Sequence, residues 1–476
     1  MAVRSVHRVS SQGHQSRLLV AALVLLALVA GPRPVLAQIG GMGGIGGIGG
    51  GGFRGGIGGG FGAVGGISID AEGIVRNADA RALEALAAER RKALADGAGL
   101  AAGKLRKVSL VAVVAEVRAA AKEGRQVSLE ASLLGGLERV THVFADPEKQ
   151  DIVLAGPADR IVVDARGNLV AAGSRRPTLQ LEDLIVALRT IDQARAGGIQ
   201  CSIDPTREGM TNYERLMAGL KTMPADKEQL FRQMETAVGS QVVTVRGVPG
   251  DSRFARVLVA ADYRMKRIGM GLDPSGVAEL PSYLALVPAA GKAAMLPRFW
   301  LEAEYEPLAH DADELSWRFG GRKMKCLSES DLLAKDGVQR GAGRADAAAE
   351  KWCAAMTANY DALAAKQPVF GELLNCIDMA VVAAIIHGRQ LDRRAGLDLA
   401  PLLDGKTVPL PVYDVPARVP TVATGLKKGS NWVLSVSGGV QFQPWQFAAN
   451  GALAADAAEA RTLALGGRPA RGVFWD

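Results

Sequence analysis

The sequence has few aromatic residues and few cysteines for its length. Aromatic side chains make up 5% of the 476 residues, and there are 4 cysteines. So few cysteines exclude a disulfide-dense miniprotein. The hydrophobic share of 48% excludes wholesale disorder. A chain of this length allows two or three domains with hydrophobic cores.

The motifs of common hydrolases are also missing. The sequence contains neither HExxH nor GxSxG. The stretch GLAAGKL at 99–105 departs from the phosphate-loop pattern by one residue and lacks the Ser or Thr that would bind magnesium. After residue 37 the histidines are His142, His310 and His387, and none has the spacing of a metal-binding helix. The sequence therefore supplies no catalytic residue and predicts no cofactor.

The N-terminus predicts a secretory signal peptide over residues 1–37. Arginines precede an unbroken apolar run from Leu18 to Ala30, and Val35-Leu36-Ala37 suits a signal peptidase. The run is shorter than the ~20 residues that span a bilayer. We therefore expect an exported protein, in the periplasm, cell envelope or extracellular space, with no transmembrane span after cleavage.

The net charge of +7 comes largely from this leader. Residues 1–37 hold four arginines and no acid, which leaves 52 basic against 49 acidic residues, a difference of +3. The remaining basic runs are short and scattered, whereas nucleic-acid binding needs clustered Lys and Arg with stacking aromatics. The composition therefore argues against a nucleic-acid partner.

A glycine-rich segment follows, with 18 glycines among the 27 residues of 40–66. Two of every three residues here are Gly, whereas collagen has one Gly in three, so no triple helix is implied. The sequence predicts a low-complexity tether over 38–66, because the backbone entropy of glycine opposes ordering. The alternative is an extended helix with three residues per turn, which would align Met42, Ile45 and Ile48.

The rest of the chain predicts an α+β fold of mixed helices and antiparallel hairpins. Predicted helices cover 78–95, 110–121, 128–134, 178–188, 211–220, 255–265, 345–365 and 372–387. Predicted hairpins cover 67–75, 140–154, 161–171 and 299–319. We expect two α+β domains, 67–205 and 206–390, and a C-terminal extension, 391–476, with a short hairpin. The helix at 372–387 is apolar on almost every face, which indicates a central buried helix.

Two segments are candidate sites. His310, Asp311, Asp313 and Glu314 share a loop between two aromatic-rich strands, where they could hold a divalent ion or simply form a solvated hairpin loop.

The second candidate is the stretch Asp262-Tyr263-Arg264-Met265-Lys266-Arg267. If it is helical, Tyr263, Lys266 and Arg267 share one side and could bind an anionic or glycan group. The alternative is a surface helix with an Asp262–Lys266 pair.

The four cysteines all follow the leader and would reach an oxidising compartment. Four cysteines allow three complete pairings. Cys326 lies in a predicted strand and Cys353 in the following helix, so we expect one bridge between them. Cys201 and Cys376 would be either paired or buried as thiols.

Several segments resemble a domain-of-unknown-function family of secreted proteins known mainly from planctomycete bacteria. They are IVLAGPADRIVVDARGNLVAAGSRRPTLQLEDLIVALRT (152–190), GIQCSIDPTREGMTNYERL (198–216), VLVAADYRMKRIGMGLDPS (257–275), RFWLEAEYEPLAH (298–310) and GSNWVLSVSGGVQFQPW (429–445). The resemblance covers about residues 105–445. It implies an exported bacterial protein and supplies no activity.

These observations predict a non-enzymatic binding or structural protein of the cell envelope or extracellular space. Its partners would be envelope components or other secreted proteins. The alternative is a secreted hydrolase acting on peptide or glycan.

The leader generates the first prediction. The mature protein should begin at Gln38, because the signal peptidase would cut after Ala37. N-terminal sequencing of the native protein checks it, and a sequence beginning at Met1 would contradict it.

Overall fold

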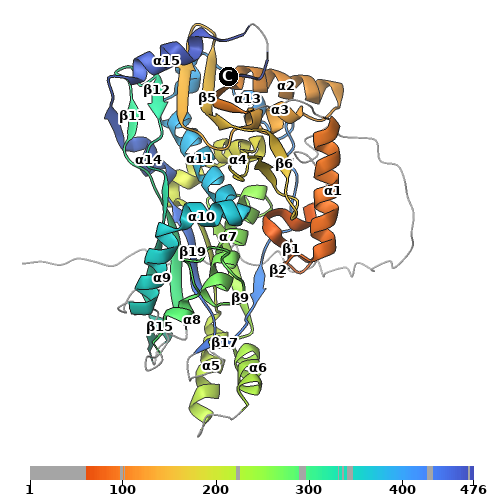
Figure 1. The fold of residues 1–476 in the computed structure, drawn as a ribbon, viewed down its shortest axis with the longest axis vertical. Coiled ribbons are helices and arrows are strands. Elements are labelled where there is room, and N and C mark those ends of the chain that lie inside the picture. The colour runs from red at the N-terminus through yellow and green to blue at the C-terminus, as the bar shows by residue number, and fades with distance from the viewer. Residues whose placement is uncertain are drawn as a thin grey trace, which may run out of the picture. The chain divides into compact units, whose positions relative to one another are not determined.

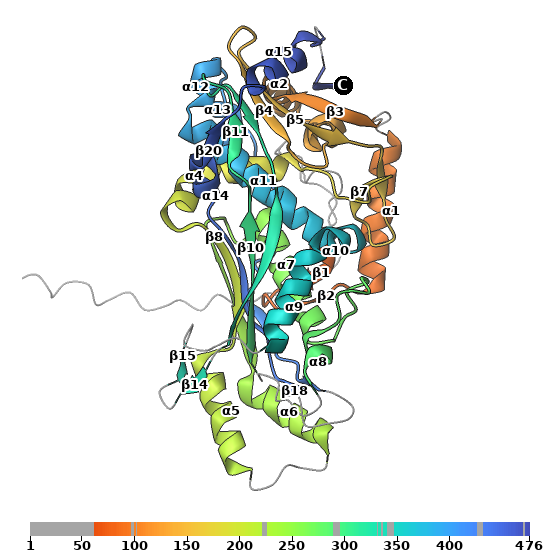
Figure 2. The ribbon, with the colours of Figure 1, turned by 60° about the vertical axis from the view of Figure 1, so that its left-hand side comes forward.

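Two large sheets organise the part of the chain that the structure describes (Figures 1 and 2). The computed structural model describes residues 61–96, 100, 102–220, 226–288, 296–330, 332–334, 337–339, 347–425, 432–469 and 472–476. The predicted signal peptide and the glycine-rich segment up to residue 60 lie outside these residues. Helices are mixed with mainly antiparallel sheets, so the predicted α+β class is confirmed.

The seven-stranded sheet has the order β20-β11-β12-β4-β5-β3-β21. Its strands are β3 (Gly103–Ser109), β4 (His142–Asp146), β5 (Asp151–Ala158), β11 (Leu308–His310), β12 (Ser316–Arg318), β20 (Gly451–Leu453) and β21 (Phe474–Trp475). Only β11 and β20 run parallel; the other neighbours are antiparallel. The predicted hairpin over 140–154 is confirmed as β4 and β5, with Val143 opposite Leu154.

The six-stranded sheet has the order β13-β10-β19-β8-β9-β16. Its strands are β8 (Ile199–Asp204), β9 (Ser240–Arg246), β10 (Pro297–Glu304), β13 (Lys323–Ser330), β16 (Arg418–Pro420) and β19 (Ser437–Phe442). They come from all three segments that the sequence suggested as domains or extension. The described residues belong to one compact unit, so the two-domain arrangement is not confirmed.

Small hairpins and helices complete the fold. The paired short strands are β1 (Ile67–Ile69) with β2 (Val75–Asn77), β6 (Ile161–Val163) with β7 (Leu169–Ala171), β14 (Leu332–Ala334) with β15 (Gly337–Gln339), and β17 (Thr424–Gly425) with β18 (Trp432–Val433). The helices are α1 (Ala80–Asp96), α2 (Leu110–Glu123), α3 (Leu129–Ser132), α4 (Leu181–Gly197), α5 (Arg207–Gly219), α6 (Lys227–Val238), α7 (Arg253–Gly269), α8 (Tyr283–Leu286), α9 (Ala347–Ala358), α10 (Tyr360–Lys366), α11 (Pro368–Gly388), α12 (Leu391–Ala395), α13 (Ala400–Leu403), α14 (Pro444–Ala449) and α15 (Ala457–Gly466). Two 3-10 segments are η1 (Phe61–Gly66) and η2 (Leu134–Gly136).

Helix α11 is the central helix that the sequence predicted (Figure 1). Proline at its first position suits the start of a helix, because the amide hydrogen that it lacks would have no partner there. The helix packs against α4, α7, α10 and α14. By length and composition it could cross a membrane, but its most apolar 18-residue window is wholly buried in the structure. That burial is what a core helix shows.

The predicted helix over 345–365 is wrong at one point, because it is two helices. Asn359 separates α9 from α10 with a non-helical backbone (φ −106°, ψ 11°). Its side-chain amide donates to the carbonyl oxygen of Ala355 at 2.9 Å. An asparagine that bonds to the backbone in this way competes with helix continuation.

The last residues of the glycine-rich segment are packed, so the predicted tether extends too far. Ala63 and Val64 in η1 are 2% and 5% exposed. The segment packs against α7 and α11. Gly65 has a φ of +71°, and a Cβ there would lie 2.6 Å from the Cβ of Ala260 on α7. Only glycine allows so close an approach.

This contact generates the second prediction. Gly65→Ala should lower the free energy of unfolding by at least ~1 kcal/mol more than Gly124→Ala. Gly124 is the matched control, because its φ is +65° but nothing lies within 4 Å of its Cβ position. Urea denaturation of both variants measures the difference. Equal losses would show that η1 is not packed on α7.

A buried ionic cluster joins α4, α7 and α11. The guanidinium of Arg253 on α7 pairs with Asp183 on α4 and, at 3.2 Å, with Glu372 on α11. The Tyr413 hydroxyl donates to Glu182 Oε2 at 3.2 Å. Glu182 and Asp183 lie in the first turn of α4, where acidic side chains suit the positive end of a helix, and both are buried. Burial raises the pKa of Glu182 to about 8, and the charge of Asp183 adds to this effect.

The third prediction follows from Glu182. The folded state keeps its proton up to about pH 8, whereas the unfolded chain loses it near the ordinary pKa of 4.5. This contribution to stability is therefore complete below pH 4.5 and disappears as the pH rises through 8. From pH 5 to pH 9, the free energy of unfolding should fall by about 1–3 kcal/mol more in the parent than in Glu182→Gln, whose side chain stays neutral.

Unfolding free energies at both pH values check this prediction. The exposed Glu148 supplies the control, Glu148→Gln, which should keep the pH dependence of the parent. If Glu182→Gln also kept it, Glu182 would have to be ionised in the folded protein.

Candidate functional site

Helix α7 carries the second candidate segment. The hydroxyl of Ser252 accepts a hydrogen bond from the backbone N–H of Ala255 at 3.1 Å and so caps the helix. The helix that the sequence predicted over 255–265 is confirmed, and it extends further at both ends as Arg253–Gly269. The segment from Asp262 to Arg267 lies in its last two turns.

Asp262 and Lys266 face the six-stranded sheet, so the surface-helix interpretation is wrong. They are 0% and 5% exposed. The Lys266 ammonium donates to Asp262 Oδ2 at 3.0 Å, to the carbonyl oxygen of Ile203 at 2.8 Å and to that of Gly438 at 3.1 Å. An ammonium has three hydrogens, and all three are used. Lys266 therefore ties α7 to β8 and β19 and does not bind an external anion.

Burial also controls the chemistry of Asp262. It raises the pKa of the carboxyl to about 7, against the opposing effect of the Lys266 charge. The Cys201 thiol lies 4.0 Å from Asp262 Oδ2. Burial raises the pKa of that thiol well above its ordinary value, so it is no thiolate nucleophile. This group of side chains is a buried structural link.

A cavity of about 320 Å³ lies beside the last turns of α7. We call it the α7–β16 cavity. The residues that line it are Val75, Arg76, Ile203, Gln241, Tyr263, Lys266, Arg267, Met270, Leu272, Val419, Pro420, Val422 and Val436. Most are aliphatic. The charged ones are all basic, and Asp, Glu, His, Ser and Cys do not occur among them. The hairpin β1–β2 supplies Val75 and Arg76, and β16 supplies Val419 and Pro420.

Two polar groups of this cavity have hydrogen-bond donors to spare. Arg76 is an exposed residue of β2, and among the described residues its guanidinium has no hydrogen-bond or ion-pair partner. Gln241 is 7% exposed. Its Oε1 accepts from the Ser435 hydroxyl at 2.8 Å, while its Nε2 has no partner in the described part of the chain. Donors therefore face an otherwise aliphatic space.

Arg267 is already paired. Its Nε and Nη2 donate to the two carboxylate oxygens of Asp273, at 2.8 and 3.0 Å. Its guanidinium lies 5.5 Å from the centre of the Tyr263 ring. Burial alone would raise the pKa of Asp273, but Arg267 and Arg264 outweigh it and hold that pKa below its ordinary value. Of the predicted binding residues, Tyr263 and Arg267 thus form a fixed wall of the cavity.

The His310 loop is held together by its own contacts. His310 Nδ1 lies 2.8 Å from the carbonyl oxygen of Asp311. Asp311 Oδ1 accepts from the backbone N–H groups of Leu315 and Ser316, at 2.7 and 3.1 Å. Its other oxygen lies 3.3 Å from Arg461. Asp311 is therefore a buried turn-forming residue.

The other acids of this loop also contact arginines. Glu314 Oε1 lies 3.3 Å from Arg389, and the main-chain oxygen of Asp313 accepts from Arg394. Across the described residues, no group of three or more His, Cys, Asp or Glu side chains is placed to hold a metal ion. The geometry therefore favours the plain hairpin loop over the ion site.

One comparison bears on the α7–β16 cavity. Residues 201–283 match a family model, described as "Protein of unknown function (DUF1598)". The matched segment runs from β8 to the start of α8 and supplies Ile203, Gln241, Tyr263, Lys266, Arg267, Met270 and Leu272 of the cavity lining. No curated protein and no solved structure matches the chain. The match confirms a domain of unknown function; export and the bacterial group stay predictions.

Sequence reasoning missed Arg76 and Gln241. Their place beside the cavity depends on contacts between residues far apart in the sequence: Ile74, next to β2, bridges to Arg418, and Gln241 on β9 pairs with Val419. No local pattern indicates such a meeting, because strand register depends on the whole sheet.

The structure brings together the two cysteines of the predicted bridge. The sulfur atoms of Cys326 on β13 and Cys353 on α9 lie 3.3 Å apart as free thiols. Cys201 and Cys376 are each fully buried. Cys376 interacts with Asp183, and Cys201 with Asp262. The bridge itself stays a prediction.

The fourth prediction tests that bridge. In protein purified from the exported fraction, Cys326 and Cys353 should be joined, because an oxidising compartment favours disulfides between adjacent thiols. Closing this loop is worth about 3–4 kcal/mol on the chain-entropy model. Non-reducing peptide mapping checks it, and alkylation of both residues without reduction would reject it.

Proposed function

We propose that this protein is an exported, non-enzymatic binding protein of the cell envelope or extracellular space. Its ligand is an aliphatic carboxylate held in the α7–β16 cavity. The observation that carries the proposal is an aliphatic cavity whose charged lining residues are all basic. The predicted signal peptide supports export.

The aliphatic lining supplies the affinity. Each Å² of apolar ligand surface removed from water contributes about 25 cal/mol. The cavity volume of about 320 Å³ lies at the lower end of the range for small-molecule sites. This size suits a medium-length alkyl chain and is too small for a folded partner.

The donors supply the orientation. A guanidinium such as that of Arg76 can bind both oxygens of a carboxylate. The Nε2 of Gln241 can donate a further hydrogen bond. No acidic residue lines the cavity.

The same lining argues for binding over hydrolysis. Hydrolysis needs a nucleophile or a general base near the bond that breaks. The cavity lining includes no Asp, Glu, His, Ser or Cys, and its Lys266 ammonium is saturated. A ligand there would be held unchanged.

The fifth prediction tests the proposed function by calorimetric titration of the mature full-length chain with sodium decanoate below its micellar concentration. Binding should be saturable, with one site per chain. Arg76→Gln should weaken it at least ~10-fold, since a charged hydrogen bond is worth about 1.5–3 kcal/mol. Val422→Trp, which fills the cavity, should abolish it.

The controls are Arg81→Gln and Val412→Trp, both at exposed positions that do not line the cavity. Both should bind decanoate like the parent. Absence of saturable binding to the parent, or equal weakening by Arg76→Gln and Arg81→Gln, would refute the proposed function.

A further inference from the structure

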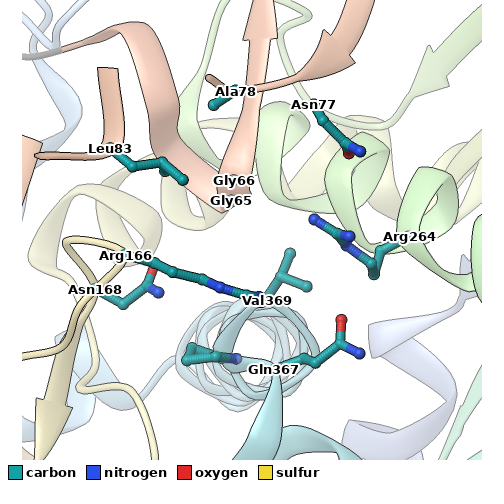
Figure 3. A pocket seen from close by; sticks show the side chains of 11 residues that line it. Gly65, Gly66, Asn77, Ala78, Leu83, Arg166, Asn168, Arg264, Gln367 and Val369 are labelled. Carbon is teal, nitrogen blue, oxygen red and sulfur yellow. The ribbon is translucent and has the colours of Figure 1, made fainter. Parts of the chain in front are cut away.

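A second cavity, of about 200 Å³, lies at the N-terminal end of α11 (Figure 3). We call it the α11 cavity. The residues that line it are Gly65, Gly66, Asn77, Ala78, Leu83, Arg166, Asn168, Arg264, Gln367, Pro368 and Val369. This lining has fewer aliphatic residues than that of the first cavity, and the two share no residue.

Two arginines give the α11 cavity its charge. Figure 3 shows Arg166 and Arg264 extending from different elements toward the space in front of α11. Arg264 pairs with Asp273, which it shares with Arg267. The backbone N–H of Arg166 donates to Asp164 Oδ1 at 2.8 Å, but its guanidinium has no hydrogen-bond or ion-pair partner among the described residues. Burial lowers the pKa of Arg264, Asp273 opposes this effect, and the charge of Arg166 lowers the pKa further. An anion between the two guanidinium groups would relieve that repulsion.

The N-terminal end of α11 adds to the positive charge in the α11 cavity. The helix has 21 residues, and its first residues, Pro368 and Val369, line the cavity. The N-terminus of a helix carries a partial positive charge and favours anions. No acidic side chain lines the cavity to cancel it.

Gln367 adds a separate requirement. Its Nε2 donates to the carbonyl oxygens of Pro274 and Ser275, at 3.0 and 2.8 Å. These bonds fix which end of the amide faces the cavity, and Figure 3 shows its oxygen turned toward Arg264. The side chain is 7% exposed. Its Oε1 has no partner in the described part of the chain. A buried acceptor without a donor is costly, so a ligand that fits here brings an O–H or N–H group.

We propose that the α11 cavity binds a small oxyanion that carries its own hydroxyl group, of the class of hydroxycarboxylates or monohydrogen phosphate. The anionic oxygens face Arg166 and Arg264, and the hydroxyl donates to Gln367 Oε1. This site is independent of the aliphatic carboxylate site.

Two matched pairs of probes test the proposal by calorimetry on the mature full-length chain at about pH 8 and constant ionic strength. They are malate against succinate and phosphate against sulfate, and in each pair only the first carries the hydroxyl. We expect malate or phosphate to bind with one site per chain, at least ~10-fold more tightly than its matched partner. The member that binds identifies the source of the oxyanion.

Variants then locate the site. Arg166→Gln should weaken this binding at least ~10-fold and leave decanoate binding unchanged. Arg160→Gln removes an exposed charge just before β6, outside the cavity lining, and should change neither. Circular dichroism confirms that both variants are folded.

Three results would overturn the proposal. They are no saturable binding of any of the four probes, equal affinity within both pairs, and equal weakening by Arg166→Gln and Arg160→Gln. Decanoate binding would be untouched by any of them, so the proposed function would stand or fall separately.

Discussion

The guanidinium of Arg253 is the contact on which the described fold depends most. It lies in the interior between carboxylates of α4 and α11, while its own helix, α7, packs on the six-stranded sheet. A buried charge that loses its partner costs about 3–5 kcal/mol, so separating the three helices is strongly unfavourable. Apolar packing brings α4, α7 and α11 together, and this ionic cluster selects one arrangement of them.

Both proposed sites inherit their geometry from that arrangement. The last turns of α7 form one wall of the α7–β16 cavity, and Arg264 of the same helix reaches the α11 cavity. Asp273 binds Arg264 and Arg267 together and so fixes one arginine of each cavity. The hairpin β1–β2 contributes to both linings, with Val75 and Arg76 in one and Asn77 in the other. Rigid elements, rather than loops alone, therefore position the groups that would bind ligands.

Local patterns were enough to predict most of the long helices. They were wrong about the hairpin over 299–319, because β10 pairs with β13 and β19 while β12 pairs with β4 and β11. The helical pattern over 78–95 predicted α1, the apolar faces of 372–387 predicted the burial of α11, and the four-residue spacing predicted the Asp262–Lys266 pair. The strand-then-helix order even anticipated that Cys326 and Cys353 would be neighbours. Each of these inferences depends on residues close in the sequence.

The features that the sequence did not predict depend on contacts between residues far apart in the chain. Lys266 is buried because Ile203 and Gly438, far away in the chain, supply its acceptors. The burial of Glu182 and Asp183 depends on Arg253 and Tyr413, which are likewise far away in the chain. Arg76 reaches its cavity only because β2 lies against the segment of β16. No local sequence pattern indicates contacts between residues so far apart, and the candidate site was therefore predicted only in part.

The central claim is that the α7–β16 cavity holds an aliphatic carboxylate. Isotope-filtered NMR on methyl-labelled protein tests it most directly, because nuclear Overhauser effects report contacts between ligand and side chain. With saturating decanoate, the account predicts effects from the alkyl chain to the methyl groups of Val419 and Val436, which line the cavity. Bound decanoate without contacts to these methyl groups would contradict it.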